Sequence, residues 1–114
     1  MTSPSQEGIA KLQMLEQQLQ TFSMRRQQFH MQTIEIENAL KELGETKEKP
    51  FKLVGSIMVQ TDKEILTKEL QAKQETLRVR IKSLEQQEEQ FKKKAEKLQQ
   101  DILAQLQKEG DTKK

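Results

Sequence analysis

The chain has 114 residues, of which 32% are hydrophobic and 33% are charged, and it contains no Trp, Tyr or Cys. This is too little apolar material for a compact globular core, so the composition favours an elongated helical protein. The lack of Cys excludes a disulfide framework and thiolate zinc sites. A net charge of +2, from 20 basic and 18 acidic residues mixed along the chain, is too balanced to argue for a nucleic-acid partner on its own.

The sequence also argues against a signal peptide and a membrane-spanning segment. The N-terminus shows no basic segment followed by an apolar run, and no 18 consecutive apolar residues occur anywhere. We therefore expect a soluble, cytoplasmic protein.

A first helix is predicted over about residues 4–44. Ser3-Pro4-Ser5-Gln6 is a capping box with Pro at the first helical position, and Gly44 is placed as a left-handed residue that ends the helix. Between them, apolar residues follow a heptad that only Arg26 and Thr33 interrupt. Its two columns are Leu12, Leu19 and Leu40, and Leu15, Phe22, Phe29, Ile36 and Leu43.

A β-hairpin is predicted over residues 50–60. Two apolar, β-branched runs flank Gly55-Ser56, a pair suited to a two-residue primed turn, which sets Val54 opposite Ile57. Both faces are then apolar, and a lone hairpin also leaves two unpaired edges. We expect hairpins from several chains to pair into a larger sheet or a closed barrel. The predicted oligomerisation residues are Phe51, Leu53, Val54, Gly55, Ile57, Met58 and Val59.

A second helix is predicted over about residues 62–108. Thr61 and Glu64 form a second capping box, and Gly110 follows the helix end. Its heptad columns are Leu70, Leu77, Leu84, Phe91 and Leu98, and Ile81, Ala95 and Ile102.

The short connection favours an antiparallel two-helix coiled coil. Its predicted layers pair Leu40 with Leu70, Phe29 with Ile81, Leu19 with Phe91 and Leu12 with Leu98. The same register brings the polar seam residues Arg26 and Glu88 into adjacent layers, where they can meet. The fold class is thus mainly α: one domain over 1–114, with a single β-hairpin at the inter-helix connection that joins an oligomeric β-barrel.

Catalysis, metal and cofactor sites are not expected. His30 has no second His, Cys or carboxylate cluster in a ligand spacing, so it is interpreted as a solvated surface residue. Lys92-Lys93-Lys94 is interpreted as a solvated face rather than a site for an acidic partner. Met24 and Met31 lie off the seam. Two interpretations remain for them: contact with a neighbouring chain, or simple exposure to solvent.

The two chain ends carry more apolar residues than a two-helix seam needs. One interpretation is an adaptable hydrophobic binding patch, and the other is that these residues wrap a fraying end or make oligomer contacts. The residues predicted to bind a client protein are Ile9, Leu12, Met14, Leu15, Leu98, Ile102, Leu103 and Leu106.

The order helix, Phe51-Lys52-Leu53-Val54-Gly55 hairpin, helix resembles the prefoldin beta-type subunits. Phe51 stands where a Tyr is common in these subunits, and this exchange keeps the aromatic ring. A single hairpin is similar to the beta type and unlike the alpha type, which has two. The second helix is similar to archaeal beta subunits at Glu69-Leu70, Glu75-Thr76-Leu77, Arg80 and Leu84-x-x-Gln87-Glu88.

The resemblance implies a hexamer of two alpha and four beta subunits, with a double β-barrel body and six coiled-coil tentacles. It further implies ATP-independent capture of unfolded proteins at the tentacle tips and their delivery to a group II chaperonin. The alternative is a structural coiled-coil spacer without client binding. A nucleic-acid or membrane-surface binder would need a one-sided basic stripe, which the interspersed acidic residues argue against.

Overall fold

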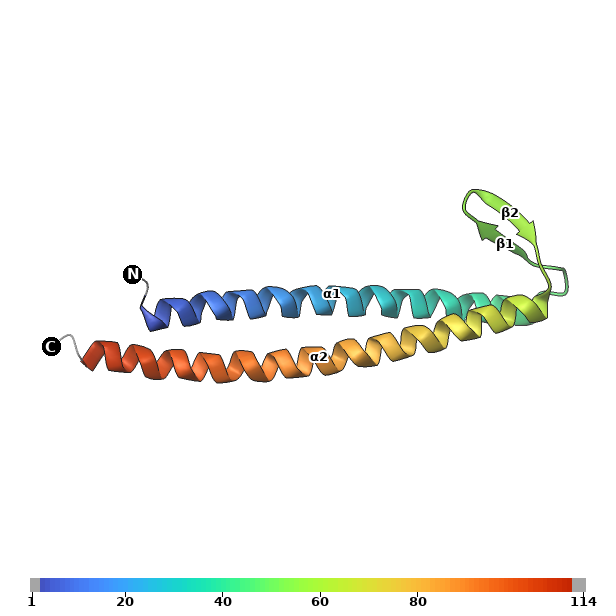
Figure 1. Ribbon diagram of the computed structural model, residues 1–114. Coiled ribbons are helices and arrows are strands. Elements are labelled where there is room, and N and C mark those ends of the chain that lie inside the picture. Colours follow the sequence, from blue (N-terminus) through green and yellow to red (C-terminus); the bar gives the residue numbers. More distant parts are fainter. Residues whose placement is uncertain (1–2, 112–114) are drawn as a thin grey trace. The chain divides into compact units, whose positions relative to one another are not determined.

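The computed structural model describes residues 3–111; residues 1–2 and 112–114 of the predicted domain lie outside the described residues. The chain runs α1 (Pro4–Glu45), β1 (Phe51–Val54), β2 (Ile57–Gln60) and α2 (Lys63–Asp111), as Figure 1 shows. β1 and β2 form one antiparallel two-stranded sheet. The predicted fold class, two long helices with a hairpin between them, is therefore confirmed.

The chain divides into two compact units. The first, here called the end unit, consists of the chain up to Arg26 and from Ser83 onward; the second, the hairpin unit, is Gln27–Lys82. In each unit a segment of α1 is paired with a segment of α2. No helix within residues 3–111 has the length and the hydrophobicity that crossing a membrane requires.

In the end unit the two helical segments run antiparallel. The rings of Phe22 and Phe91 meet edge to face, with centroids 5.2 Å apart, and one turn further on Arg26 bonds to Glu88. The contact between Arg26 and Glu88 confirms the predicted meeting of the two polar seam residues. The predicted neighbour of Phe91 is Leu19. The observed ring contact of Phe91 is with Phe22, three residues further along α1.

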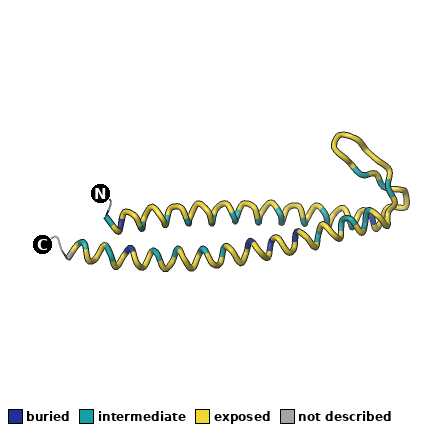
Figure 2. Tube along the Cα trace, in the orientation of Figure 1, coloured by how far each residue is buried: buried dark blue, intermediate teal, exposed yellow. Residues whose placement is uncertain are grey.

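In the hairpin unit the buried residues follow the predicted columns. Leu43, Leu77 and Ile81 are buried, and the Arg80 guanidinium lies 5.9 Å from the centroid of the Phe29 ring, on the edge of the seam. Figure 2 shows that buried and half-buried positions recur along both helices while the hairpin is almost wholly exposed. The burial therefore has the heptad spacing that the sequence predicts.

The capping box that begins α1 is formed as predicted. The Gln6 amide nitrogen donates to the Ser3 hydroxyl, and the Ser3 amide nitrogen donates to the Gln6 side chain, at 3.2 and 3.1 Å. The predicted box at the start of α2 is wrong by one residue. The Leu66 amide donates to the Asp62 carbonyl, so Asp62 rather than Thr61 is the N-cap.

Neither predicted glycine stop is observed. Gly44 has no left-handed backbone, and α1 continues to Glu45. Two of its last carbonyls have other donors: Thr46 donates to the Glu42 carbonyl, and the Lys63 ammonium donates to the Gly44 carbonyl at 3.5 Å. These bonds satisfy part of the helix end without a left-handed residue. α2 likewise continues through Gly110 to Asp111.

Candidate functional site

The hairpin has the predicted register. Val54 is opposite Ile57, Leu53 is opposite Met58, and Lys52 is opposite Val59. Gly55 has φ +62°, and among the described residues it is the only one with positive φ, so Ser56 is not left-handed. One positive φ at the first turn position is the pattern of a type II′ turn, which needs Gly there.

All six large apolar side chains of the hairpin are open to solvent. Their exposed fractions lie between 47% and 69%. These side chains are Phe51, Leu53, Val54, Ile57, Met58 and Val59. Apolar side chains on both faces and two unpaired strand edges are what a sheet between subunits would cover. The oligomerisation role of these residues stays a prediction.

Polar bonds at the base of the hairpin set its orientation. The Thr61 amide donates to the Pro50 carbonyl at 3.0 Å and closes the ends of the two strands. The Lys52 ammonium then reaches across to the Glu69 carboxylate on α2, at 2.6 Å. Successive residues of a strand point to opposite faces, so the face that carries Lys52 is turned toward α2. The hairpin thus has an inner and an outer face, a distinction absent from the sequence.

The eight predicted client-binding residues fall into two groups of four. Leu12, Leu15 and Leu98 are half-buried and Ile102 is buried, as seam residues should be. The other four are exposed and define what we call the end patch: Ile9, Met14, Leu103 and Leu106. The accessible part of the predicted set is therefore the end patch alone.

Gly8 is a seam residue that is absent from the predicted columns. It lies seven residues before Leu15 in the heptad, and a Cβ built on it would come within 2.8 Å of Ile102 Cγ1. A side chain at this position would push against Ile102, so the glycine permits the close approach of the two helices. The only sequence feature that could have identified Gly8 as a seam residue is its place in the heptad, seven residues before Leu15.

The outer ends of the two helices in the end unit are joined by a hydrogen bond. Ser5, only 4% exposed, directs its hydroxyl at the Glu109 carboxylate, with oxygen distances of 2.8 and 3.0 Å. The Ser3 hydroxyl lies 3.0 Å from that of Ser5. This bond holds the last turn of α2 beside the first turn of α1, next to the end patch.

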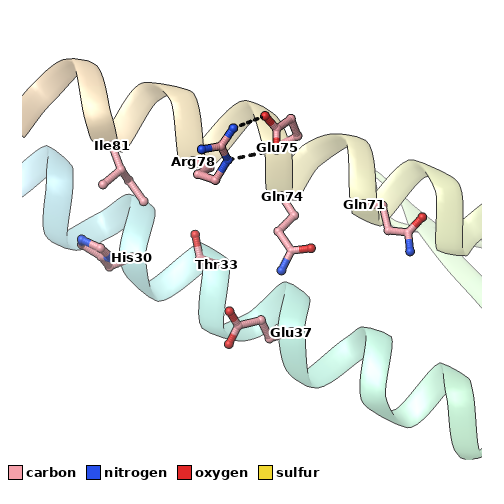
Figure 3. A pocket seen from close by; sticks show the side chains of 8 residues that line it. All are labelled: His30, Thr33, Glu37, Gln71, Gln74, Glu75, Arg78 and Ile81. Carbon is pink, nitrogen blue, oxygen red and sulfur yellow. Dashed lines mark hydrogen bonds and ion pairs between the residues drawn. The ribbon is translucent and has the colours of Figure 1, made fainter.

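A hollow of about 410 Å³ lies between α1 and α2 in the hairpin unit. Figure 3 shows Thr33 and Gln74 pointing toward it from the two helices, at seam positions where apolar residues would pack more tightly. Arg78 donates two hydrogen bonds to Glu75, and these lower the pKa of the Glu75 carboxyl and raise that of Arg78. His30 lies at the rim.

The chemistry of this hollow is limited to hydrogen bonding and one surface ion pair. Within residues 3–111, no group of three His, Cys, Asp or Glu side chains is placed to hold a metal ion. The hollow is therefore interpreted as a polar, loosely packed layer of the seam.

Comparisons with known proteins agree with these features. The family described as Prefoldin subunit matches residues 6–109. The chain is 38% identical to the prefoldin subunit beta of Archaeoglobus fulgidus over 96 residues, which cover 82% of this chain and 83% of the relative. It is 33% identical to that of Methanospirillum hungatei over 103 residues, with 89% and 86% covered.

A solved structure matches over a similar extent. The crystal structure of the prefoldin beta subunit from Thermococcus strain KS-1 aligns with a TM-score of 0.80 at 31% identity, covering 90% of this chain and 92% of the other. The helix–hairpin–helix order and the matched length are shared. The chain thus belongs to the beta class of the prefoldin subunit family.

Proposed function

We propose that this protein is an ATP-independent chaperone subunit that holds unfolded or nascent proteins at the ends of its helices and passes them to a group II chaperonin. Prefoldin is a chaperone family rather than an enzyme family, and its beta subunits assemble with other prefoldin subunits. The proposed assembly is a hexamer of two alpha and four beta subunits in the cytoplasm. Its hairpins pair into a double β-barrel.

The observation that best supports client binding is the exposed, apolar end patch. In an antiparallel helix pair of this composition, residues off the seam are ordinarily polar, yet Ile9, Met14, Leu103 and Leu106 are apolar and exposed. An unfolded chain offers varied apolar segments, which suit a shallow, adaptable surface better than a shaped pocket. Several subunits acting on one client would raise the overall affinity through effective concentration.

The test replaces the four end-patch residues by Ser and leaves the seam intact. The variant should assemble with a prefoldin alpha subunit like the parent but lose most of its ability to suppress aggregation of a chemically denatured test protein. Helix content by circular dichroism and hexamer size by light scattering establish that the variant is folded and assembled.

A matched control replaces Met24, Met31 and Ile34, three exposed apolar residues outside the end patch, by Ser. The control should protect the test protein as well as the parent does. If the end-patch variant protects equally well, the client surface lies elsewhere. If the assembled parent itself gives no protection, the chain is a structural coiled-coil subunit.

A further inference from the structure

α2 carries a second apolar stripe, close to the hairpin, that the coiled-coil seam does not use. Ile65, Ala72 and Val79 are seven residues apart, and each lies two residues before a seam column, at the outermost heptad position. All three are exposed, Ile65 and Val79 to 52% and 55%. Because this position normally faces water, a run of apolar residues there indicates a contact outside the helix pair.

The inner face of the hairpin is turned to the same side of α2. Glu69, which holds Lys52, lies four residues after Ile65 and three before Ala72, so these three residues share one side of the helix. On the strand side, Lys52 shares its face with Val54, Ile57 and Val59. These three apolar side chains are exposed, so the chain's own α2 does not cover this face of the hairpin.

The shape of α2 beside the stripe supports an inserted side chain. A hollow of about 300 Å³ is bordered by Ala72 and Leu77 of α2 and by Ile36 of α1. A second hollow, of about 260 Å³, lies at the hairpin base and is bordered by Ile65 and Gln60. Two residues of the stripe, Ala72 and Ile65, thus each border a hollow within the hairpin unit.

The geometry of sheet extension identifies the occupant. A strand added at the free edge of β1 or β2 lies about 4.8 Å away, and half of its side chains point to the same face as Val54 and Ile57. That face is directed at α2. We propose that the hairpin of a neighbouring prefoldin subunit, paired edge to edge with this one, packs its inward apolar side chains against Ile65, Ala72 and Val79.

On this proposal, which rests on the assembly part of the proposed function, α2 is one wall of the subunit interface. The stripe then covers part of the inner face of the joined sheet, and the Lys52–Glu69 ion pair keeps that face turned toward α2. Helix and hairpin then act as one assembly surface.

The test measures how fast single thiols react. The chain has no Cys, so Ala72→Cys, Val79→Cys, Ile57→Cys and Met31→Cys each introduce one reporter. Each variant is alkylated with a maleimide, alone and after mixing with an archaeal prefoldin alpha subunit. We expect alkylation at positions 72, 79 and 57 to slow by about tenfold or more in the complex, as for groups that leave solvent, and the rate at position 31 to stay unchanged.

Three results would overturn the proposal. If the complex forms and position 57 is protected while 72 and 79 react as before, the stripe is not in the interface, although the proposed assembly stands. If positions 72 and 79 become protected only when an unfolded test protein is added, the stripe binds clients. If no complex forms and position 57 stays reactive, assembly through the hairpin fails, and this inference fails with it.

Discussion

The Arg26 side chain donates a hydrogen bond from Nε to Glu88 Oε1 at 2.9 Å, inside the seam of the end unit. The two side chains are only 28% and 20% exposed, so their charges are partly removed from water. Desolvation offsets much of the attraction in such a pair, while the loss of one partner leaves a half-buried charge without its counterion. The pair therefore contributes more to the choice of register than to stability.

Replacing both residues by Leu should raise the melting temperature, because two apolar side chains would fill the same seam layers. Arg26→Leu or Glu88→Leu alone should each cost about 1–2 kcal/mol, less than in a fully buried pair because water still reaches both groups. Thermal unfolding followed by circular dichroism, arranged as a double-mutant cycle, measures the coupling. Single variants at least as stable as the double variant would contradict this account.

Packing in the seam should contribute more to the free energy of unfolding than ion pairs on the surface do. Leu77 and Leu84 are 6% and 7% exposed, so Leu77→Ala or Leu84→Ala should lower the free energy of unfolding by about 2–4 kcal/mol. An exposed ion pair joins Lys93 to Glu89, 3.9 Å apart on the surface of α2. Lys93→Ala should therefore change the free energy of unfolding by about 0.5 kcal/mol or less. Urea titrations of the three variants compare the values; equal losses would show that the seam is not the main source of stability.

A charge in the hairpin should block assembly without unfolding the helices. Val54→Asp and Ile57→Asp would place a carboxylate on the apolar inner face of the proposed sheet, where the cation Lys52 is already paired with Glu69. Sizing after mixing with an alpha subunit should show no hexamer, while the helix signal in circular dichroism is kept. Met31→Asp, a charge at an equally exposed apolar position on α1, is the control and should assemble normally.

Replacement by Ala should change the stability of the protein differently at two helical glycines. A Cβ added at Gly44 would meet no atom within 4 Å, and Gly44→Ala should stabilise the protein by up to about 1 kcal/mol through helix propensity. At Gly8 the new Cβ would meet Ile102 Cγ1 at 2.8 Å, so Gly8→Ala should forfeit that gain or destabilise. Matched melting curves distinguish the two. A Gly8→Ala variant as stabilised as Gly44→Ala would show that the helices approach less closely at this layer.

The Glu75–Arg78 pair should contribute a small, acid-sensitive stability. The hydrogen bonds from Arg78 lower the pKa of the Glu75 carboxyl in the folded state. A lowered folded-state pKa favours folding above the pKa of the unfolded chain, and this contribution is lost as the pH falls through the folded-state pKa. Glu75→Gln should therefore be slightly less stable than the parent at neutral pH and equal to it in strong acid.

The pH test uses urea unfolding at neutral and strongly acid pH. Glu85→Gln, which removes the same formal charge from another exposed site on α2, is the control for the general effect of net charge. A gap between the parent and Glu75→Gln that persists unchanged in acid would mean that the ion pair is not its cause.

The sequence by itself determined the elements, the seam and the register of the hairpin. These depend on short-range rules: a 3.5-residue spacing defines the seam columns, the reciprocal bonds of Ser3 and Gln6 begin α1, and the turn at Gly55 pairs Val54 with Ile57. The meeting of Arg26 with Glu88 also followed from the heptad count, because a regular antiparallel seam extends one local pattern along both helices.

The tertiary structure alone decided which face of the hairpin is turned toward α2 and how the ends of the helices are held. The heptad count already separated the exposed end patch from its seam neighbours, but it could not show that Ile102 closes on Gly8. The last turn of α1 receives a hydrogen bond from Lys63 at the Gly44 carbonyl, and the inner face of the hairpin is set by Glu69, seventeen residues from Lys52. Such contacts join residues distant in sequence, and they form only when the helices pack and bring their side chains within reach.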